Sequence, residues 1–208
     1  MVRIHIVSEG EHMAAIAQRY GFRDYRTVWS HPENEQLRAV RSPHVLAPSD
    51  RVTIPDFESR VAEGNTEKRH TFRVRTTRLV LRIAFQDVSG KPLSEIPCEI
   101  ETSSQPVQAT TDSDGLVSVP IEPSTLTCDL ALSGICVTAR VGYLDPVETV
   151  TGWQARLANL GYYAGAIGDE EDQRSRLAIE EFQLESDLRV TGIVDAETLA
   201  ALSRLHGC

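Results

Sequence analysis

The spacing between apolar residues changes twice along the chain, and these changes limit the folds that are open to it. Residues 11–21, EHMAAIAQRYG, carry an apolar stripe at helical spacing. Residues 77–87, TRLVLRIAFQD, instead alternate apolar and polar side chains, as in a strand with one buried face. Helical spacing returns from Val150 onward. Neither a single sheet nor a single helical bundle accounts for both periods, so we expect a multidomain α+β chain.

Composition narrows the class of protein and of partner. With 41% hydrophobic and 25% charged residues, the chain has enough apolar side chains to form folded cores, unlike an intrinsically disordered protein. Its 30 acidic side chains exceed its 21 basic ones, for a net charge of −9. Polyanions are repelled by such a chain, which argues against nucleic acid and anionic membrane surfaces as partners. A neutral glycan or another protein is the expected partner.

The N-terminal residues, MVRIHIVSEGEHMAAIAQRY, contain no long apolar run. A membrane-spanning helix needs roughly 18 apolar residues, and a signal peptide also needs an uninterrupted apolar region. We therefore expect no membrane insertion, and synthesis in the cytoplasm without a signal peptide. Work outside the cell would then require another route, such as export by a contractile injection system.

Residues 1–56 predict a strand, two helices and a second strand. The alternating runs RIHIV and RVTIP predict the strands. Between them, the apolar stripe over residues 13–20 predicts a helix, which Gly21 ends with a left-handed cap. Asp24 is placed to cap a second helix over residues 25–29, which a histidine-proline pair interrupts. The expected order is βααβ.

The stretches IVSEGEHMAAIAQRYGF and VLAPSDRVTIPD resemble the two ends of the lysin-motif (LysM) family of small βααβ domains. Where the family has Gly-Asp-Thr-Leu and Pro-Gly, this chain has GEHM at 10–13 and PSD at 48–50. The resemblance implies binding of glycans that contain N-acetylglucosamine, in a groove between the loops of residues 8–12 and 46–50. The candidate ligand-binding residues are Ser8, Gly10, Glu11, His12, Ala47, Pro48 and Ser49.

Residues 57–71 are polar and show no regular spacing of apolar residues, which indicates a linker. In residues 72–140, apolar and polar side chains alternate in short runs separated by turn sequences, which predicts short strands. FQDVSGKPLSEIPCEIE and ATTDSDGLVSVPI resemble the β-sandwich of the carboxypeptidase regulatory-like and transthyretin-like families. That resemblance implies an Ig-like spacer or docking domain. Asp112 and Asp114 would allow a calcium loop, but no glutamate completes it at the twelfth position. A tight turn is the expected role of these aspartates.

Residues 141–208 predict three amphipathic helices around one small core. Residues 145–148, DPVE, fit the N-cap, first-turn proline and capping-box glutamate of the first helix, although Gly152 could divide it. Asp195 is placed to cap the third helix. The second helix carries the apolar residues Leu177, Ala178, Ile179 and Phe182.

This last segment strongly resembles the peptidoglycan-binding domain type 1 family. The matching positions are Gln154, Leu157, Leu160, Gly161, Tyr162, Ala178, Ile179, Phe182, Gln183, Leu188, Gly192, Thr198 and Leu202. The resemblance implies a three-helix bundle that anchors other domains to cell-wall polymers without catalysis. Tyr162, Tyr163 and Gln183 are the candidate ligand-binding residues, expected to be exposed, because aromatic faces stack on sugars and amides bind acetamido and peptide groups. Tyr162 and Phe182 have a second interpretation as core residues, which we favour.

The acidic run at residues 169–172, DEED, precedes the second helix of this segment. A catalytic pair or a metal site needs carboxylates that converge, whereas consecutive ones diverge, so we expect a solvated loop. The six histidines are scattered, the four cysteines form no CxxC pair, and no hydrolase or phosphate-binding motif occurs. We therefore expect no metal, no cofactor and no catalytic residue.

These features favour a non-catalytic peptidoglycan-binding protein, acting as cargo or accessory of a contractile injection or type VI secretion apparatus. If the LysM-like and three-helix domains bind the same polymer, binding by one keeps the other close to its own site. Two weak sites on one chain would then give a stronger overall attachment. The alternative is a structural adaptor, in which the LysM-like and three-helix folds dock proteins of a baseplate or spike. The sequence leaves the choice between glycan strand and stem peptide open.

Overall fold

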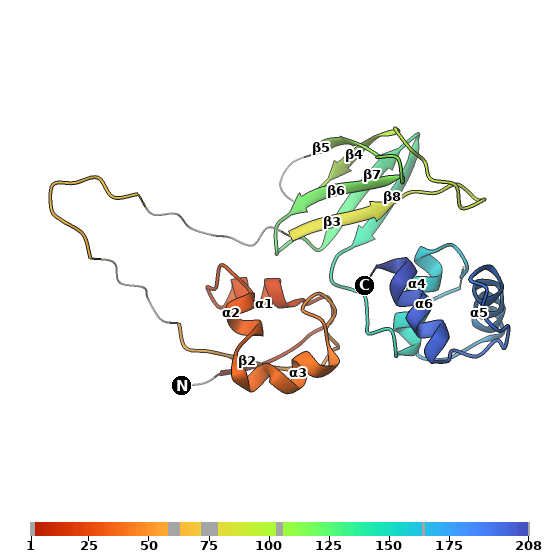
Figure 1. Cartoon of the computed structure of the whole chain (residues 1–208), viewed down its shortest axis with the longest axis horizontal. Helices are drawn as coiled ribbons and strands as arrows, with labels where there is room; N and C mark the ends of the chain where they lie inside the picture. Colours follow the sequence, from red (N-terminus) through yellow and green to blue (C-terminus); the bar gives the residue numbers. More distant parts are fainter. Residues whose placement is uncertain (1–2, 58–62, 72–78, 103–105, 164, 208) are drawn as a thin grey trace.

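The computed structural model describes residues 3–57, 63–71, 79–102, 106–163 and 165–207. Buried apolar side chains form three separate clusters, each within its own stretch of the chain. We name these stretches the N-terminal module (3–57), the sandwich (79–141) and the C-terminal module (142–207), and Figure 1 shows them as three bodies. Across the described residues, every helix is too short or too polar to cross a membrane.

The N-terminal module is a two-stranded antiparallel sheet with helices between its strands. Arg3 lies opposite Ile54, and Ile6 lies opposite Arg51. The elements are β1 (Arg3–Ile6), α1 (Met13–Arg19), α2 (Arg26–Trp29), the 3-10 helix η1 (Pro32–Asn34), α3 (Glu35–Val40) and β2 (Arg51–Ile54).

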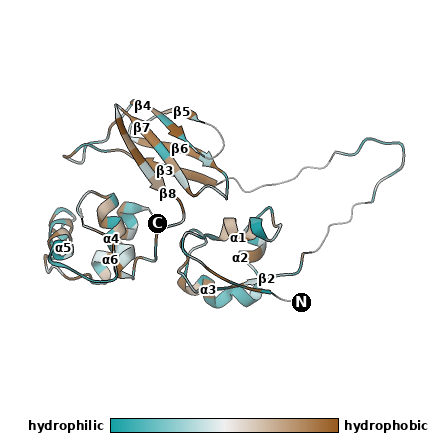
Figure 2. Cartoon of the chain, turned by 180° about the vertical axis from the view of Figure 1, so that it is seen from behind, coloured by the Kyte–Doolittle hydropathy of each residue, from teal (hydrophilic) through white to brown (hydrophobic). Residues whose placement is uncertain are grey.

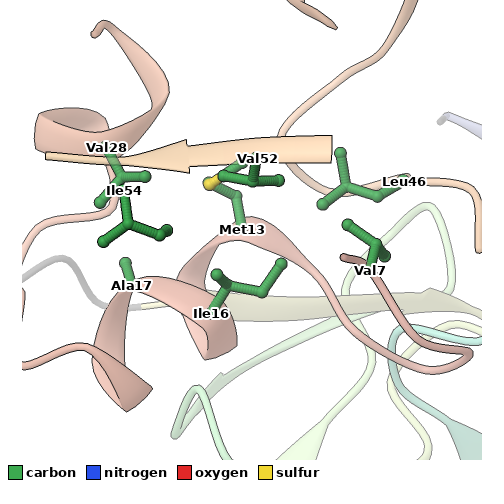
Figure 3. Close-up of a cluster of buried hydrophobic side chains, with 8 residues drawn as sticks. All are labelled: Val7, Met13, Ile16, Ala17, Val28, Leu46, Val52 and Ile54. Carbon is green, nitrogen blue, oxygen red and sulfur yellow. The ribbon is translucent and has the colours of Figure 1, made fainter. Parts of the chain in front are cut away.

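The apolar stripe predicted for α1 forms the centre of this module. Met13 and Ile16 are fully buried, and Figure 3 shows Met13 reaching towards Val52 of β2. Gly21 has a φ of +84°, so the predicted left-handed end of α1 is confirmed. The helix therefore packs its predicted face against the sheet.

The predicted βααβ order is wrong in one respect, because η1 and α3 follow α2 before the last strand. Pro32 interrupts α2, as predicted, but it also starts η1, since a proline is tolerated in the first turn of a helix. The side chain of Asn34 joins η1 to the sheet: it accepts from the Thr53 N–H at 2.7 Å and donates to the Thr53 carbonyl at 2.8 Å. No side chain of α3 is fully buried, so its sequence carries no apolar stripe to predict it.

The sandwich consists of two antiparallel sheets that enclose an apolar layer. One sheet pairs β3 with β6, and the other has the strand order β5-β4-β7-β8. Figure 2 shows that many residues of these strands are hydrophobic. The strands are β3 (Leu79–Ala84), β4 (Pro97–Glu101), β5 (Val107–Thr110), β6 (Leu116–Ile121), β7 (Thr127–Leu132) and β8 (Ile135–Arg140).

The turn predicted at Asp112 is confirmed. One oxygen of its carboxylate accepts hydrogen bonds from the N–H groups of Asp114 and Leu116, both at 2.9 Å. Gly115 has a φ of +71°, a conformation that favours glycine, and a Cβ there would overlap the carbonyl oxygen of Phe85. The Asp112 carboxylate therefore closes the turn that leads into β6.

The C-terminal module packs α4 (Val150–Asn159), α5 (Gln173–Glu185) and α6 (Ala196–His206) around one core. Each helix contributes buried apolar residues, including Leu157, Phe182 and Leu202. The Asp195 cap of α6 is confirmed, with its carboxylate accepting from the Thr198 N–H at 2.9 Å.

The predicted start of α4 is wrong. Thr149, not Asp145, is the N-cap, and its hydroxyl oxygen accepts from the Gly152 N–H at 3.0 Å. Gly152 does not divide the helix but lies in its first turn, where the Pro146 carbonyl approaches so closely that a Cβ would overlap it. Residues 145–148 thus form a turn packed against α4, and glycine permits that close approach.

Candidate functional site

Two fully buried glutamines, Gln154 on α4 and Gln183 on α5, hold the loops of the C-terminal module. The amide nitrogen of Gln154 donates to the Glu170 carbonyl at 3.0 Å and to the Ser175 hydroxyl at 3.2 Å. Its oxygen accepts from the Gly168 N–H at 2.9 Å. Gln154 therefore fixes the backbone of the acidic loop and also contacts a residue of the capping box that begins α5.

Gln183 does the same for the loop between α5 and α6. Its oxygen accepts from the N–H groups of Thr191 at 2.8 Å and Gly192 at 3.0 Å. Its nitrogen donates to the Ile193 carbonyl and to the Thr198 hydroxyl, both at 2.9 Å. Both donors and both lone pairs of the amide are thus engaged within the protein.

The expectation that Tyr163 and Gln183 are exposed between the helices is wrong. Tyr163 is 5% exposed, and its hydroxyl donates to the Ala166 carbonyl at 3.0 Å. Gln183 is buried because loop backbone groups satisfy its amide, which removes the main penalty for burying it. These two side chains help to hold the module together.

Tyr162 lies at the edge of the core. Its ring meets Phe182 edge-on, with centroids 5.4 Å apart, and its hydroxyl donates to the Glu185 carboxylate at 2.8 Å. Burial and that hydrogen bond raise the pKa of Tyr162 to about 12. The favoured core interpretation is therefore confirmed for Phe182, and Tyr162 packs against that core while remaining half-buried.

A groove of about 640 Å³ lies along α5, and we call it the α5 groove. One rim continues from the acidic loop that Gln154 holds, and the other is the loop that Gln183 holds. The lining residues are Glu171, Asp172, Gln173, Arg176, Leu177, Glu180, Gly192 and Ile193. Both rims are therefore fixed by buried hydrogen bonds to the helices.

The α5 groove offers charged and apolar surface side by side. The Nε of Arg176 donates to a Glu180 carboxylate oxygen at 3.3 Å, one helical turn away, in an exposed ion pair. Leu177 is 57% exposed and Ile193 is 66% exposed. Gly192 has a φ of +66°, and a Cβ there would lie 2.6 Å from the Glu180 carboxylate, so a larger residue would be strained and would displace the Glu180 side chain.

The acidic loop that precedes α5 is solvated, as predicted, since all four side chains of residues 169–172 are exposed. Asp172 has a further structural role as the N-cap of α5. Hydrogen bonds from the backbone N–H and the hydroxyl of Ser175 hold the pKa of the Asp172 carboxyl below its usual range. In the part of the chain that the structure describes, no three histidine, cysteine or acidic side chains are grouped as a metal site.

The lining of the α5 groove was not predicted from the sequence, although a signal was present. Ala178, Ile179 and Phe182 form the buried stripe of α5, whereas Leu177 and Leu184 lie seven positions apart on the opposite face. Of these two exposed leucines, Leu177 lines the α5 groove and Leu184 lies outside it, so Leu177 is the part of this signal that marks the groove. Ile193 joins this surface from another element, which helical spacing does not reveal.

In the N-terminal module, the two candidate loops lie together. The Val7 N–H donates to the Asp50 carbonyl at 2.9 Å, and the Ser49 N–H donates back to the Val7 carbonyl at 2.8 Å. The Ala47 N–H donates to the Asp50 carboxylate at 2.8 Å. Ser8, Pro48 and Ser49 are exposed, and Ala47 is half-buried.

The carboxylate of Glu11, by contrast, is engaged inside the module. It accepts from the Ser8 N–H at 2.9 Å, lies 2.7 Å from the Nε2 of His5 and forms an ion pair with Arg19. Burial works against its ionisation, but the hydrogen bonds from Ser8 and His5, together with the electrostatic attraction of His5 and Arg19, outweigh burial and lower the pKa of Glu11. This network shapes the loop of residues 8–12.

His12 is buried and caps α1. Its Nδ1 accepts from the Ala15 N–H at 3.4 Å, so the ring must be neutral at that nitrogen. Burial, together with the nearby His44, lowers the pKa of His12. Like Glu11, His12 is committed to contacts within the chain.

The loop of residues 8–12 also contacts the segment that enters the C-terminal module. Gly10 and Gly142 both have positive φ, at +81° and +85°. A Cβ on Gly10 would lie 2.8 Å from the Tyr143 ring, and a Cβ on Gly142 would overlap the Gly10 carbonyl oxygen and lie 3.3 Å from the His12 ring. We call these four residues the seam. It covers part of the loop in which the LysM resemblance places a ligand.

Comparison with known protein families bears on the C-terminal module. Residues 142–202 match the family described as "Putative peptidoglycan binding domain". The resemblance predicted for this segment is confirmed. The matched range contains both buried glutamines and the α5 groove. No curated protein and no solved structure matched the chain.

Proposed function

We propose that this chain binds peptidoglycan through the α5 groove. The observation that carries the proposal is the match of residues 142–202 to a peptidoglycan-binding family. The α5 groove lies within that range and presents exposed side chains, whereas Tyr163 and Gln183 are buried. Because both rims are fixed by the glutamine amides, a ligand would order few groups on binding, which favours affinity.

The proposal includes binding without cleavage. Among the described charged side chains of the α5 groove, Arg176 and Glu180 are paired with each other and Asp172 is engaged in a cap. Such groups can hold a ligand, whereas hydrolysis needs a base held against a water or a nucleophile. Incubation of the protein with purified muropeptides should release no new fragments on chromatography, and fragments that require this chain would contradict the proposal.

Retention on purified peptidoglycan sacculi tests the binding. The wild-type chain should sediment with sacculi, and Leu177→Asp should reduce the sedimenting fraction because it places a charge on the apolar part of the α5 groove. Leu184→Asp is the matched control, since Leu184 is equally exposed on the same helix but outside the groove. Both variants should keep the wild-type circular dichroism spectrum. A wild-type chain that stays in the supernatant would refute the proposal.

A second candidate function, protein docking, draws its support from the seam. The N-terminal module uses the loop of residues 8–12 to contact Gly142 and Tyr143, so this loop already packs against another segment of the same chain. On this proposal the module is a LysM-like connector in a baseplate or spike, delivered with a contractile apparatus. Titration with N-acetylglucosamine tetramer distinguishes glycan binding from protein docking by the N-terminal module. Shifted amide resonances at residues 8–12 support glycan binding by this module, and unchanged resonances support docking.

A further inference from the structure

The chemistry of the α5 groove points to one part of peptidoglycan. Peptidoglycan offers a glycan strand, which is neutral because its lactyl carboxyl groups are in amide bonds to the stem peptides, and the stem peptides themselves, which carry free carboxylates, the amino group of a diamino acid and alanine methyl groups. We infer that the α5 groove binds the stem peptide and not the glycan strand. This inference rests on the proposed function and adds the ligand class to it.

The first argument is that the α5 groove offers no aromatic side chain on which a sugar ring could stack. None of the described residues that line the α5 groove is aromatic. An aromatic ring presents a flat apolar face with polar edges, the surface against which a pyranose packs. The nearest candidates by sequence are committed elsewhere, because Tyr163 is buried and Tyr162 packs on Phe182.

The second argument is the guanidinium group of Arg176, which can bind a carboxylate. Arg176 uses its Nε for Glu180, and among the described residues its two terminal nitrogens have no hydrogen-bond acceptor. A guanidinium with free terminal N–H groups matches a carboxylate with two parallel hydrogen bonds. A stem peptide supplies such a carboxylate.

The third argument is the combination of acidic and apolar groups beside that cation. Glu171 and Glu180 line the same groove, and either carboxylate can accept from the ammonium group of a diamino acid. Leu177 and Ile193 provide exposed apolar surface that alanine methyl groups can cover. A ligand with both charges and short aliphatic groups is complementary to this lining, whereas an uncharged sugar would leave the charges unmatched.

The size of the α5 groove agrees with this ligand. Its volume of about 640 Å³ lies within the roughly 300–1,000 Å³ typical of sites for small ligands. A volume of this order suits a short ligand, such as a few residues of peptide.

The test uses the full chain labelled with 15N and two probes. One probe is a synthetic stem pentapeptide with a diamino acid at its third position, and the other is N-acetylglucosamine tetramer. We expect the pentapeptide to shift the amide resonances of Gly192 and Ile193. Arg176→Gln should raise its Kd about tenfold, the loss expected for a charged hydrogen bond. Arg174→Gln is the control on the same helix, outside the groove, and should change Kd by less than about twofold.

A sacculus assay separates failure of this inference from failure of the proposed function. Untreated sacculi are compared with glycan strands that an amidase has freed of stem peptides; because this treatment dissolves the sacculus, the strands are coupled to amine beads through the lactyl carboxyl groups that the amidase frees. Retention on sacculi but not on the beads supports the inference. Retention on both materials, or tetramer shifts at Gly192 without pentapeptide shifts, overturns the inference and leaves the proposed function standing. No retention on untreated sacculi overturns both.

Discussion

Replacement of Gly142 by alanine should open the seam between the N-terminal and C-terminal modules. Gly142 has a φ of +85°, and its added Cβ would overlap the Gly10 carbonyl oxygen and lie 3.1 Å from the carbonyl carbon. A clash with backbone cannot be relieved by a change of rotamer. Gly134 is the matched control, because it has a φ of +82° and a Cβ there would meet nothing within 4 Å.

The difference between the two variants isolates the contact. Alanine in the left-handed conformation costs about 1–2 kcal/mol at either position. Overpacking against fixed atoms adds about 1–3 kcal/mol, and only Gly142→Ala carries it. Because the modules have separate cores, we expect the segment to move away from Gly10. Each 1.4 kcal/mol corresponds to about a tenfold change in the open population.

Hydrogen exchange measured by mass spectrometry is the assay. Peptides that cover residues 8–12 should exchange faster in Gly142→Ala than in Gly134→Ala, since the segment that covers this loop has moved away. Small-angle scattering should show a larger radius of gyration for Gly142→Ala alone. Equal exchange at residues 8–12 in the two variants would refute the reasoning, because it would show that the seam does not hold the modules together.

Three further predictions concern single modules. Gly152→Ala should lower the stability of the C-terminal module by about 3 kcal/mol or more, seen as a lower Tm, because the Cβ would overlap the Pro146 carbonyl. Gln183→Leu should lower it by about 2–4 kcal/mol in urea unfolding, because the loop N–H groups, including that of Gly192, lose their acceptor. The N-terminal module should lose stability as the pH falls below about 6.5: the pKa of His12 is lowered by folding, so the unfolded chain binds more protons in that range.

Each of these predictions has a control and a contradicting result. Gly168→Ala, where a Cβ meets nothing within 4 Å, should leave the Tm of the C-terminal module nearly unchanged. A Gln183→Leu variant as stable as the wild type would show that the loop does not depend on the amide. For the pH dependence, His12→Asn keeps a side-chain acceptor for the α1 cap without titrating near neutrality, so it should flatten the profile below about pH 6.5. An unchanged profile would exclude His12 as the cause.

Features that depend on neighbouring residues were predicted from the sequence. The buried face of α1, the Gly21 end, the Asp112 turn and the Asp195 cap all follow from side chains within a few positions of one another. α3 was missed because it packs through partly buried groups and has no fully buried residue. The start of α4 was misplaced because residues 145–148 carry a cap-like pattern, whereas hydrogen bonds from Thr149 to the Pro146 carbonyl fold them into a turn before the helix.

The candidate site was harder to predict because its parts are distant in sequence. The buried amide of Gln183 forms its hydrogen bonds with loop groups eight or more positions away. The residues next to Gln183 in the sequence give no indication that these hydrogen bonds will form. The α5 groove combines Leu177 with Ile193 from a separate loop. Helical spacing assigns Leu177 to α5 but gives no sign that another element completes a concave surface beside it.

The two buried glutamines reach their loops through main-chain atoms: the Gly168 N–H and Glu170 carbonyl for Gln154, and the backbone at residues 191–193 for Gln183. A main-chain hydrogen bond does not depend on the identity of the side chain that the residue carries. Exposed positions of these loops can therefore be exchanged while the scaffold stays intact. The C-terminal module can accordingly serve as a scaffold for libraries with randomised loop residues. Variants that bind different cell-wall components could be selected from such libraries without changing the helices.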